Sequence, residues 1–465
     1  MSVLHARHLS FLPPFPSLTF PISNSLYHLR AALPFRHWRP SHAPQFSSRP
    51  FSSRSRPPLR GSGSSANGTS GGGSLPADNG PEGLFASSPE LEQLAIKSVS
   101  APVLSRIVSY NLLSSSLADP THFPACDPSN LRAATRLGRI LAKLEGPVAS
   151  RSIICLQEVS LAWSGHLHTF FANRGFHLLL ASHGSYFNGY MGEGLAFPLD
   201  LYEAVDLRIE RLTDRMGWPS KRRPEGVAKA IANVCGRLQR AANALFGPKR
   251  PNRIAKRDPW DHARGRYNRF IFARLRSRTN GAKLCVATYH MPCIFWSPPV
   301  MLIHAALAVR TFQRLCGEDL GVLAGDFNIK PDDASYSMIL SGDVDPKHSS
   351  FPVSTPDGSP PEKWFPAPLT PMKSAYKEIL GEEPDFTNYA KVENQATFIE
   401  TLDYLFCTRD VDIVDVIRLP KRDSFEGPLP DADEPSDHIM IGATLRLPAP
   451  TRRPQRVVSA RSLQN

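Results

Sequence analysis

Short apolar runs recur along the chain from residue 103 onward, and each has the length of one buried β-strand. Between them lie segments in which apolar residues repeat every three or four positions, the spacing of an amphipathic helix. The predicted strands cover residues 104–110, 153–156, 176–181, 195–197, 284–289, 320–324, 397–406, 411–419 and 439–447. Strands and helices that alternate in this way predict an α/β domain with a large core over residues 103–448.

End signals complete the helix predictions. Ser129 is expected to cap a first helix that Gly146 terminates, and a second helix follows Ser160. A third opens at Pro298 and Pro299 and stops near Gly317, because proline is favoured in the first turn and glycine just past the end. A fourth covers residues 334–340.

The segment 318–333 contains the predicted strand 320–324, and polar side chains follow directly after that strand. Gly325 follows the apolar run at a point where the backbone needs freedom. Asp326 and Asn328 come next, two residues apart and on one side of the chain. A carboxylate there suits orienting or deprotonating water, and a carboxamide suits donating to an oxyanion. Because Asp and Asn are also turn residues, Gly-Asp-x-Asn alone does not separate a site from a turn.

Polar motifs follow other predicted strands in the same way. They are Ser109-Tyr110-Asn111, Leu156-Gln157-Glu158, His290, Leu402-Asp403-Tyr404 and Ser436-Asp437-His438. Taken in order with Gly-Asp-Phe-Asn, the set resembles the endonuclease/exonuclease/phosphatase superfamily over residues 104–447. The segment 385–389, Asp-Phe-Thr-Asn-Tyr, most resembles the branch that holds the carbon catabolite repressor deadenylases, nocturnin, angel proteins and 2′–5′ phosphodiesterases.

The resemblance implies a fold and a set of roles. The fold is a four-layer α/β/β/α sandwich of the deoxyribonuclease I-like type. Glu158 and Asp437 are expected to hold Mg²⁺ or Mn²⁺, with Asn111 and Asn328 positioning the metal and the phosphate. Asp326 is expected to orient the attacking water. The resemblance also pairs His438 with Asp403, with His438 acting as a base or as a hydrogen-bond donor to the phosphate. His290 is expected to stabilise the charge of the transition state. The residues expected to bind the substrate are Asn388, Phe386, Asn268, Arg266 and Arg264.

Phosphodiester hydrolysis independently favours a hard divalent cation, which offsets charge on phosphate oxygens and acidifies bound water. Carboxylates are the ligands such a cation prefers, and the chain has no Cys/His spacing typical of zinc. Three residues keep two interpretations. Glu193, between Gly192 and Gly194, is a site carboxylate or part of a turn, Asn268 contacts phosphate or is structural, and His304 is a packed or a surface histidine.

The ends of the chain differ from the body. Residues 1–77 carry eight Arg but no Asp, Glu or Lys, a composition typical of a disordered organelle transit peptide, mitochondrial in preference to chloroplast. Gly61 to Gly73 reads as a flexible linker, residues 78–102 as a further linker and 449–465 as a disordered tail. The seven Cys include no Cys-x-x-Cys pair and are typical of reduced thiols.

Charge is concentrated in one internal segment. Residues 201–280 hold 20 Lys and Arg against 7 Asp and Glu. Residues 201–267 are interpreted as a basic insertion containing an amphipathic helix after Pro224, and 345–371 as a Pro-rich loop that is functional or disordered. A basic segment beside an acidic centre favours a polyanionic substrate, with Trp260, Tyr267, Phe386 or Tyr389 available to stack on bases.

These observations favour a metal-dependent phosphodiesterase that acts on RNA in an organelle, as a 3′-exoribonuclease or an oligoadenylate phosphodiesterase. Three alternatives stay open: a phosphatase of a small phosphorylated metabolite or nucleotide, a DNA-repair endonuclease, and a non-catalytic RNA-binding module. Fold alone does not choose among them. The chain has no apolar run as long as the ~18 residues that suggest a membrane span.

Overall fold

The computed structural model describes residues 101–221 and 258–450, with a few isolated positions between them. The predicted presequence, almost all of the linker that follows it, and most of the basic helix after Pro224 lie outside the described residues. So do Arg253, Lys256 and Arg257 of the basic segment, and the tail from residue 451. No helix of the described part is long and apolar enough to cross a membrane.

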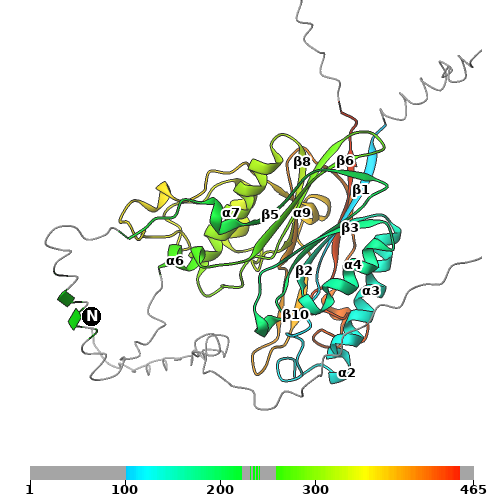
Figure 1. The fold of residues 1–465 in the computed structure, drawn as a ribbon, viewed down its shortest axis with the longest axis horizontal. Helices are drawn as coiled ribbons and strands as arrows, with labels where there is room; N and C mark the ends of the chain where they lie inside the picture. Colours follow the sequence, from blue (N-terminus) through cyan, green and yellow to red (C-terminus); the bar gives the residue numbers. More distant parts are fainter. Residues whose placement is uncertain are drawn as a thin grey trace, which may run out of the picture. The chain divides into compact units, whose positions relative to one another are not determined.

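Two six-stranded sheets face each other at the centre of the described body (Figure 1). The first has the strand order β13-β14-β1-β2-β4-β3 and the second β5-β6-β7-β8-β12-β9. The first sheet comprises β1 (Val103–Asn111), β2 (Ile153–Val159), β3 (Phe176–Ser182), β4 (Gly192–Pro198), β13 (Asp412–Val416) and β14 (Ile441–Leu447). The second comprises β5 (Tyr202–Arg211), β6 (Arg269–Ser277), β7 (Lys283–Tyr289), β8 (Leu320–Asp326), β9 (Lys373–Ser374) and β12 (Asp403–Cys407).

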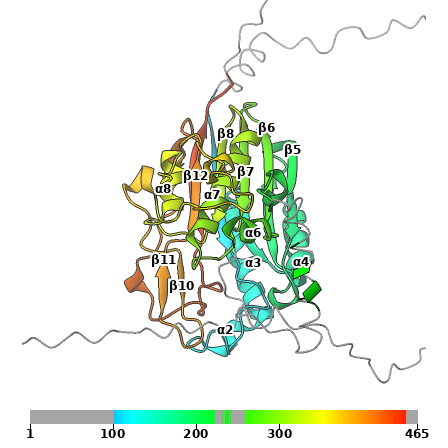
Figure 2. The same ribbon diagram turned by 90° about the vertical axis from the view of Figure 1, so that its left-hand side faces the viewer.

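Helices cover the outer face of each sheet, which confirms the predicted four-layer sandwich. On the first sheet lie α3 (Ala133–Ala149) and α4 (Leu161–Ala172), and on the second α7 (Pro298–Cys316) and α8 (Ala334–Ser341) (Figures 1 and 2). The shorter elements are α2 (Pro128–Leu131), α6 (Pro259–Arg264), α9 (Ala375–Leu380), and the hairpin of β10 (Asn388–Ala390) and β11 (Phe398–Glu400). The short 3₁₀ turns are η2 (Tyr186–Asn188), η3 (Leu212–Arg215), η4 (Pro361–Lys363) and η5 (Arg422–Ser424).

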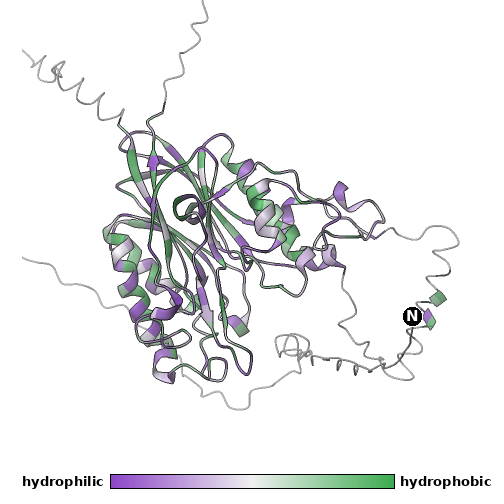
Figure 3. Ribbon diagram, turned by 180° about the vertical axis from the view of Figure 1, so that it is seen from behind, coloured by the Kyte–Doolittle hydropathy of each residue, from purple (hydrophilic) through white to green (hydrophobic). Residues whose placement is uncertain are grey.

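Alternation along the strands creates one core between the sheets and one beneath each helical layer. Ile153 and Cys155 of β2 face the second sheet, whereas Ile154 and Leu156 face α3 and α4. Because both faces of β2 are buried, its successive residues form a continuous apolar run in the sequence. Figure 3 shows hydrophobic residues in the strands and along the helices that cover them.

Strand direction brings the polar motifs to one end of the sandwich. Strands β1 and β2 are parallel in the first sheet, and β7 and β8 are parallel in the second, so the last residues of each pair lie side by side. Strand β12 runs antiparallel to β8 with Asp403 opposite Asp326. Residues that come last on β1, β2, β7 and β8 therefore meet the residue that begins β12.

Gly325 allows β8 to lie close to the end of β7. Its φ is 145°, and a Cβ built at this position would lie 2.0 Å from the carbonyl oxygen of Tyr289. A side chain at residue 325 would therefore push the two strands apart. Met291 N donates to Asp326 O at 2.8 Å directly after this approach. The glycine predicted to need freedom is thus required by a close backbone contact, and it places Asp326 beside His290.

A polar side chain links the two sheets behind the site. Gln157 of β2 donates through Nε2 to Ser109 Oγ of β1 (3.1 Å) and to Thr288 Oγ1 of β7 (2.9 Å). All three side chains are buried. A buried amide whose partners come from both sheets fixes how one sheet lies over the other, because a buried donor without an acceptor costs ~1–3 kcal/mol.

Several predicted boundaries are wrong for identifiable reasons. Asp127, not Ser129, caps the first helical segment, which breaks at Arg132 before α3. Helix α3 then continues through Gly146, because a single Gly inside a helix costs only ~1 kcal/mol relative to Ala. The run 397–406 splits into β11 and β12 at Thr401 and Leu402, where backbone pairing changes to a different partner strand.

Two predicted departures from the compact plan are smaller than expected. Strand β5 pairs with β6 along its length, and α6 packs into the core through Trp260, so both ends of the predicted insertion 201–267 belong to the fold. The Pro-rich loop 345–371 is likewise packed, because Phe351, Phe365 and Leu369 are buried against α7 and its neighbours. The apolar residues of this Pro-rich segment were the sequence signal that could have predicted its packing against the core.

Candidate active site

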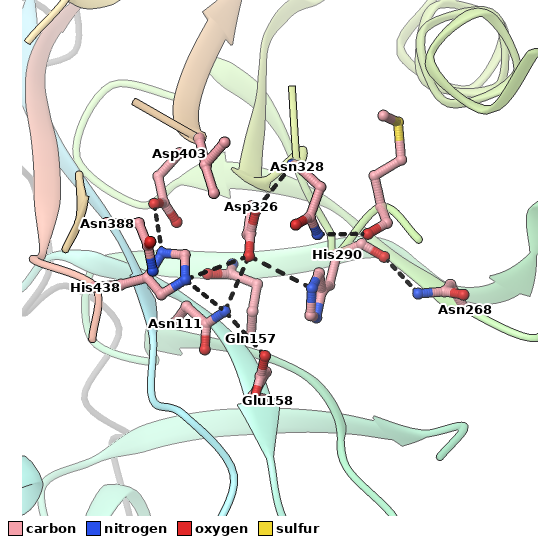
Figure 4. A network of polar contacts seen from close by, with 12 residues as sticks. Asn111, Gln157, Glu158, Asn268, His290, Asp326, Asn328, Asn388, Asp403 and His438 are labelled. Atoms are coloured by element: carbon pink, nitrogen blue, oxygen red, sulfur yellow. Dashed lines mark hydrogen bonds and ion pairs between the residues drawn. The ribbon is translucent and has the colours of Figure 1, made fainter. Parts of the chain in front are cut away.

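Asp326 lies at the centre of a polar network at the end of β8 (Figure 4). Its Oδ1 accepts from the backbone N–H of Asn328 (2.9 Å), and its Oδ2 accepts from Asn111 Nδ2 (3.0 Å). The Nε2 atoms of His290 and His438 lie 3.4 and 3.7 Å from the same Oδ2. Burial raises the pKa of Asp326, while the two histidines act in the opposite direction. The predicted carboxylate is therefore held between two possible proton carriers.

His438 is fixed by a second carboxylate. Its Nδ1 lies 2.7 Å from Asp403 Oδ2, which also accepts from Thr387 Oγ1 at 2.7 Å. Burial alone would lower the pKa of His438, but Asp403, Asp437 and Asp326 together raise it well above its usual value. The structure thus brings the predicted His438–Asp403 pair together, directs Nε2 toward Asp326, and favours a charged ring.

Glu158 stands opposite this group at the end of β2. Asn111 Nδ2 donates to its Oε1 (3.3 Å), and the backbone N–H of Ser114 donates to its Oε2 (2.9 Å). Glu158 has φ 55°, a left-handed conformation uncommon for a residue with a long side chain, in a bulge where β2 shifts register against β4. Such backbone conformations occur at functional sites, where the surroundings hold them in place.

Asn111 orients carboxylates in this arrangement. Its Oδ1 accepts from the backbone N–H of Leu113 (2.9 Å), and this bond turns the amide nitrogen toward Glu158 and Asp326. The NH₂ group of an amide donates hydrogen bonds and does not bind a metal. The oxygen donors in this part of the site are therefore the carboxylates, with Asn111 holding two of them in position.

Asp437 has the properties of a cation ligand. Its Oδ1 is buried without a hydrogen-bond partner, and its Oδ2 accepts from Asn388 Nδ2 at 3.3 Å. Burial raises the pKa of Asp437, the charge on His438 lowers it, and nearby Glu158 raises it again. Two carboxylates that repel each other, one with an unsatisfied buried oxygen, fit a hard divalent cation. Glu158 and Asp437 together are thus suited to hold Mg²⁺ or Mn²⁺.

A second group of possible ligands lies nearby. Among the described residues, Asp326, Asp403 and His438 bring ligand atoms within 4.8 Å of one another. However, His438 uses Nδ1 on Asp403, and the carboxylates of Asp403, Asp437 and Asp326 raise its pKa and so favour the protonated ring. A protonated imidazole cannot ligate a metal. This group is better explained as a proton-handling chain than as a metal site.

His290 and Asn328 are held by backbone contacts beside Asp326. Asn268 Nδ2 donates to the carbonyl oxygen of His290 (2.8 Å), and Asn328 Nδ2 donates to that of Met291 (2.8 Å). Asn268 therefore has the structural role, which was one of its two interpretations. Asn328 is left-handed, with φ 51°. Its side chain fixes the loop that follows His290.

The predicted substrate residues are not gathered in one place. Asn388 lies beside Asp437 and is part of the site. Phe386 is fully buried between Tyr389 and Phe425, so its predicted stacking on a base is wrong. Arg264 is exposed at the end of α6, and Arg266 contacts His262 on the same segment. Trp260 is also buried, with Nε1 donating to Ser354 O. Short motifs do not reveal which aromatic faces are covered.

The remaining histidine and carboxylate questions are answered by burial. His304 is packed, and its ring contacts Tyr289 Oη (3.0 Å) and Ala263 O (3.1 Å). Glu193 is completely buried on β4, with Oε2 3.3 Å from His183 Nδ1. A buried carboxylate beside a histidine is more than a turn residue, but among the described residues Glu193 forms no hydrogen bond or ion pair with Asp326 or Glu158.

Arg136 is a site-supporting residue that sequence reasoning missed. It lies on α3 without exposure, and its guanidinium donates to the carbonyl oxygens of Leu112, Leu113 and Pro435. These carbonyls follow Asn111 and precede Asp437. The available signal was its position four residues before Ile140 on the apolar face of the predicted helix, where a charged residue needs a partner.

The fold and the site together define a class of protein: an α/β/β/α sandwich with carboxylates and histidines gathered at the ends of its central strands. The model of the endonuclease/exonuclease/phosphatase family matches residues 108–438, and the chain belongs to this family. The family's members are phosphoric ester hydrolases that generally use divalent metals.

Two relatives from Arabidopsis thaliana show the extent of the similarity. Carbon catabolite repressor protein 4 homolog 4 is 31% identical over 178 residues, which cover 35% of this chain and 37% of the relative. Carbon catabolite repressor protein 4 homolog 2 is 25% identical over 386 residues, covering 75% and 58%. The aligned part thus spans less than two thirds of either relative's length.

A solved structure has the same fold. The structure of ANGEL2, described as a 2′,3′-cyclic phosphatase in complex with adenosine-2′,3′-vanadate, superimposes with a TM-score of 0.53 at 16% identity. The match covers 74% of this chain and 96% of that one. At this identity the likeness concerns the fold, and it confirms the predicted sandwich.

Proposed function

We propose that this protein is a divalent-metal-dependent phosphodiesterase that hydrolyses RNA. The observation that carries the proposal is the position of Asp326, which is buried with Asn111, His290 and His438 around one carboxylate oxygen. Glu158 and Asp437 lie beside this group, and Oδ1 of Asp437 is buried without a hydrogen-bond partner. A carboxylate between two histidines, next to a hard-cation site, is suited to directing water at phosphorus.

Each side chain has a defined task in this proposal. Glu158 and Asp437 would hold a Mg²⁺ or Mn²⁺ ion, which would offset negative charge on a phosphate oxygen. Asp326 accepts a hydrogen bond from the attacking water and takes up its proton. His438, charged and fixed by Asp403, donates a hydrogen bond to a non-bridging oxygen, and His290 does the same from the other side. A positioned acid or base contributes typically ~10²–10⁴ in rate.

An RNA substrate is supported by charge and by topology. The basic segment 201–280 includes the connection from β5 to β6, which leaves Arg211 and returns at Arg269. Those two residues pair with each other, and Phe270 pairs with Tyr289, the residue before His290. The connection therefore leaves and re-enters the fold at the catalytic end. Arg211, Arg264 and Arg266 at the described ends of this connection suit a chain of phosphates more than a single phosphomonoester.

The test compares substrates and single variants. Purified protein with Mg²⁺ is assayed on poly(A), mixed-sequence RNA, 2′–5′ oligoadenylate, abasic DNA and NADPH. RNA hydrolysis should stop on addition of EDTA and return with Mg²⁺ or Mn²⁺. Glu158→Gln and Asp326→Asn should each lower kcat at least ~10²-fold without lowering the melting temperature. The matched control is Asp410→Asn, an exposed carboxylate beyond the other end of β12, which should behave as wild type.

Two results would overturn this function. Full activity of Asp326→Asn in EDTA would remove both the carboxylate and the metal from the mechanism. Hydrolysis of NADPH or abasic DNA with no hydrolysis of any RNA would remove the substrate class while leaving a phosphoric ester hydrolase. The substrate comparison therefore separates the chemistry from its target.

We also propose that the protein works in mitochondria. The support is the acid-free, Arg-rich composition of residues 1–77. Those residues fused to a fluorescent reporter should direct it to mitochondria, and an Arg-to-Asp series in the same residues should abolish import. Accumulation in chloroplasts or in the cytosol would contradict this location.

A further inference from the structure

Two loops at the catalytic end expose aromatic rings. The loop between β3 and β4 carries Tyr186, which is 85% exposed, together with Phe187 and Tyr190, which are also exposed. The loop between β7 and α7 carries Phe295 (71% exposed) and Trp296 (50% exposed). Such rings at a protein surface lose contact with water favourably when a partner covers them.

The first loop is joined to the predicted metal ligand. Gly192, the first residue of β4, pairs with both Ser182 of β3 and Val159 of β2, so the loop leaves the sheet next to Glu158. Ser114 Oγ donates to Asn188 O at 2.8 Å, and the backbone N–H of Ser114 donates to Glu158 Oε2 at 2.9 Å. Two hydrogen bonds through one residue thus connect η2 to the site carboxylate.

The second loop begins at His290. Phe295 is five residues further along the chain, so its backbone lies within ~18 Å of that histidine even if the loop were fully extended. The aliphatic residues Met291 and Ile294 of this loop are buried, whereas Phe295 and Trp296 face outward as an edge-to-face pair with centroids 5.2 Å apart. The loop therefore exposes its aromatic rings and covers its aliphatic side chains.

The two loops leave the same end of the sandwich. Strand β4 packs against β6 and β7 across the sandwich, so the loops leave facing sheets at the same end. One is fixed to Glu158 and the other continues from His290. Beside the second loop, Tyr267 is exposed with the Arg211 guanidinium 4.2 Å from its ring centroid.

We propose that Tyr186, Phe187, Tyr190, Phe295 and Trp296 form a base-stacking rim for the unpaired nucleotides next to the scissile phosphate. The inference rests on the proposed function and narrows its substrate to single-stranded RNA. Stacking is sequence-tolerant, because every base has a π-face, and contributes ~1–3 kcal/mol per base. The position of the rings favours the bases of a bound substrate, because one loop is hydrogen-bonded to Glu158 through Ser114 and the other follows directly on His290.

Binding to two matched probes tests the rim apart from catalysis. The first probe is a fluorescein-labelled ten-nucleotide oligoadenylate, and the second has the same sugar–phosphate backbone without bases. Both are measured by anisotropy in the Asp326→Asn background with Mg²⁺. The double variant Tyr186→Ala/Phe295→Ala should weaken binding of the first probe at least ~10-fold, since two bases lose their platforms. Its affinity for the baseless probe should not change.

Conservative variants and a variant of an exposed residue outside the two loops serve as controls. Tyr186→Phe/Phe295→Tyr keeps both rings and should bind both probes as the Asp326→Asn protein does. Val353→Ser removes an exposed apolar side chain of the Pro-rich loop and should also have no effect. Because the altered residues are exposed, circular dichroism melts should be unchanged.

The outcomes separate the rim from the proposed function. If wild-type protein hydrolyses RNA but the double Ala variant binds oligoadenylate normally, the rim is wrong and the function stands. An equal loss for both probes would also overturn the rim, because backbone contacts rather than bases would then be affected. If wild-type protein hydrolyses no RNA and binds neither probe, the proposed function fails first.

Discussion

Arg136 connects stability to catalysis through the backbone beneath the site. Its Nε donates to Pro435 O at 2.6 Å, and its Nη2 donates to Leu112 O and Leu113 O, both at 2.5 Å. Burial lowers the pKa of Arg136 to about 10, with Asp437 acting in the opposite direction, so the guanidinium stays charged at neutral pH. One side chain thus joins the segment after Asn111 to the segment before Asp437.

Replacing Arg136 with Met should destabilise the fold by about 3 kcal/mol. Three buried carbonyls would lose their donor at ~1–3 kcal/mol each. Relief of the desolvation penalty of a buried charge, several kcal/mol, offsets part of this. Unfolding entropy of ~2.1 cal/mol/K per residue over roughly 350 residues gives ~0.7 kcal/mol/K. The melting temperature should therefore fall by only ~4 °C.

The effect on catalysis should be larger than the effect on melting. A shift of ~1 Å in a positioned group can cost ~10²-fold in rate, and Arg136 positions the segments that carry Asn111 and Asp437. Hydrolysis of RNA is measured well below both melting temperatures. Arg136→Lys keeps the charge but not the planar fork, so it should fall between wild type and Met.

Arg139→Met is the matched control for Arg136→Met. Arg139 lies on the same helix and contacts Asn130 Oδ1 (2.9 Å) and Asp431 O (3.1 Å), further from the site. It should keep kcat within about twofold. A kcat for Arg136→Met equal to that of wild type, with the expected loss of melting temperature, would show that Arg136 supports the fold without positioning the site.

Three further predictions concern single side chains. Asp403→Asn should lower the pKa of His438, because Asp403 is the largest of the contributions that raise it, so the high-pH limb of the kcat profile should move to lower pH; an unmoved limb would contradict this. Burial lowers the pKa of His304 to about 3, so stability is lost as pH falls below ~6.5, where the unfolded chain takes up the proton. Between pH 7 and 5 wild type should lose ~2 kcal/mol more than His304→Gln, measured by urea unfolding, and equal losses would refute the buried neutral ring. Phe386→Ala should cost ~3–5 kcal/mol of stability with KM for RNA unchanged in the folded protein, whereas a raised KM without destabilisation would restore the stacking interpretation.

The site residues that could be predicted from the sequence are those that lie at the end or the beginning of a predicted strand. Asp326, Glu158 and Asp403 follow or begin apolar runs, and parallel neighbours bring such positions together in any sandwich of this kind. Gly325 was recognisable for the same reason, since a strand that must approach another closely needs a residue without a Cβ.

What could not be predicted depends on contacts between distant segments. Arg136 reads as an ordinary helical arginine until the carbonyls of residues 112, 113 and 435 are seen around it. Phe386 reads as an available ring until Phe425, from a separate loop, is seen to cover it. Asn111 has the residue type of a ligand, and only the bond from Leu113 N decides which end of its amide faces the carboxylates.

Gln157 has a consequence for how the protein can change through evolution. Glu158 and Asn111 come from one sheet, and Asp326 and His290 from the other, so catalysis depends on the offset between the sheets. Apolar side chains at the interface tolerate small sliding motions, but the bonds of Gln157 to Ser109 and Thr288 do not. Core substitutions elsewhere can therefore accumulate without misaligning the two halves. A substitution at Gln157 that removed the hydrogen bond to Thr288 would allow one sheet to shift against the other while the fold stayed intact. Activity would then fall before stability did.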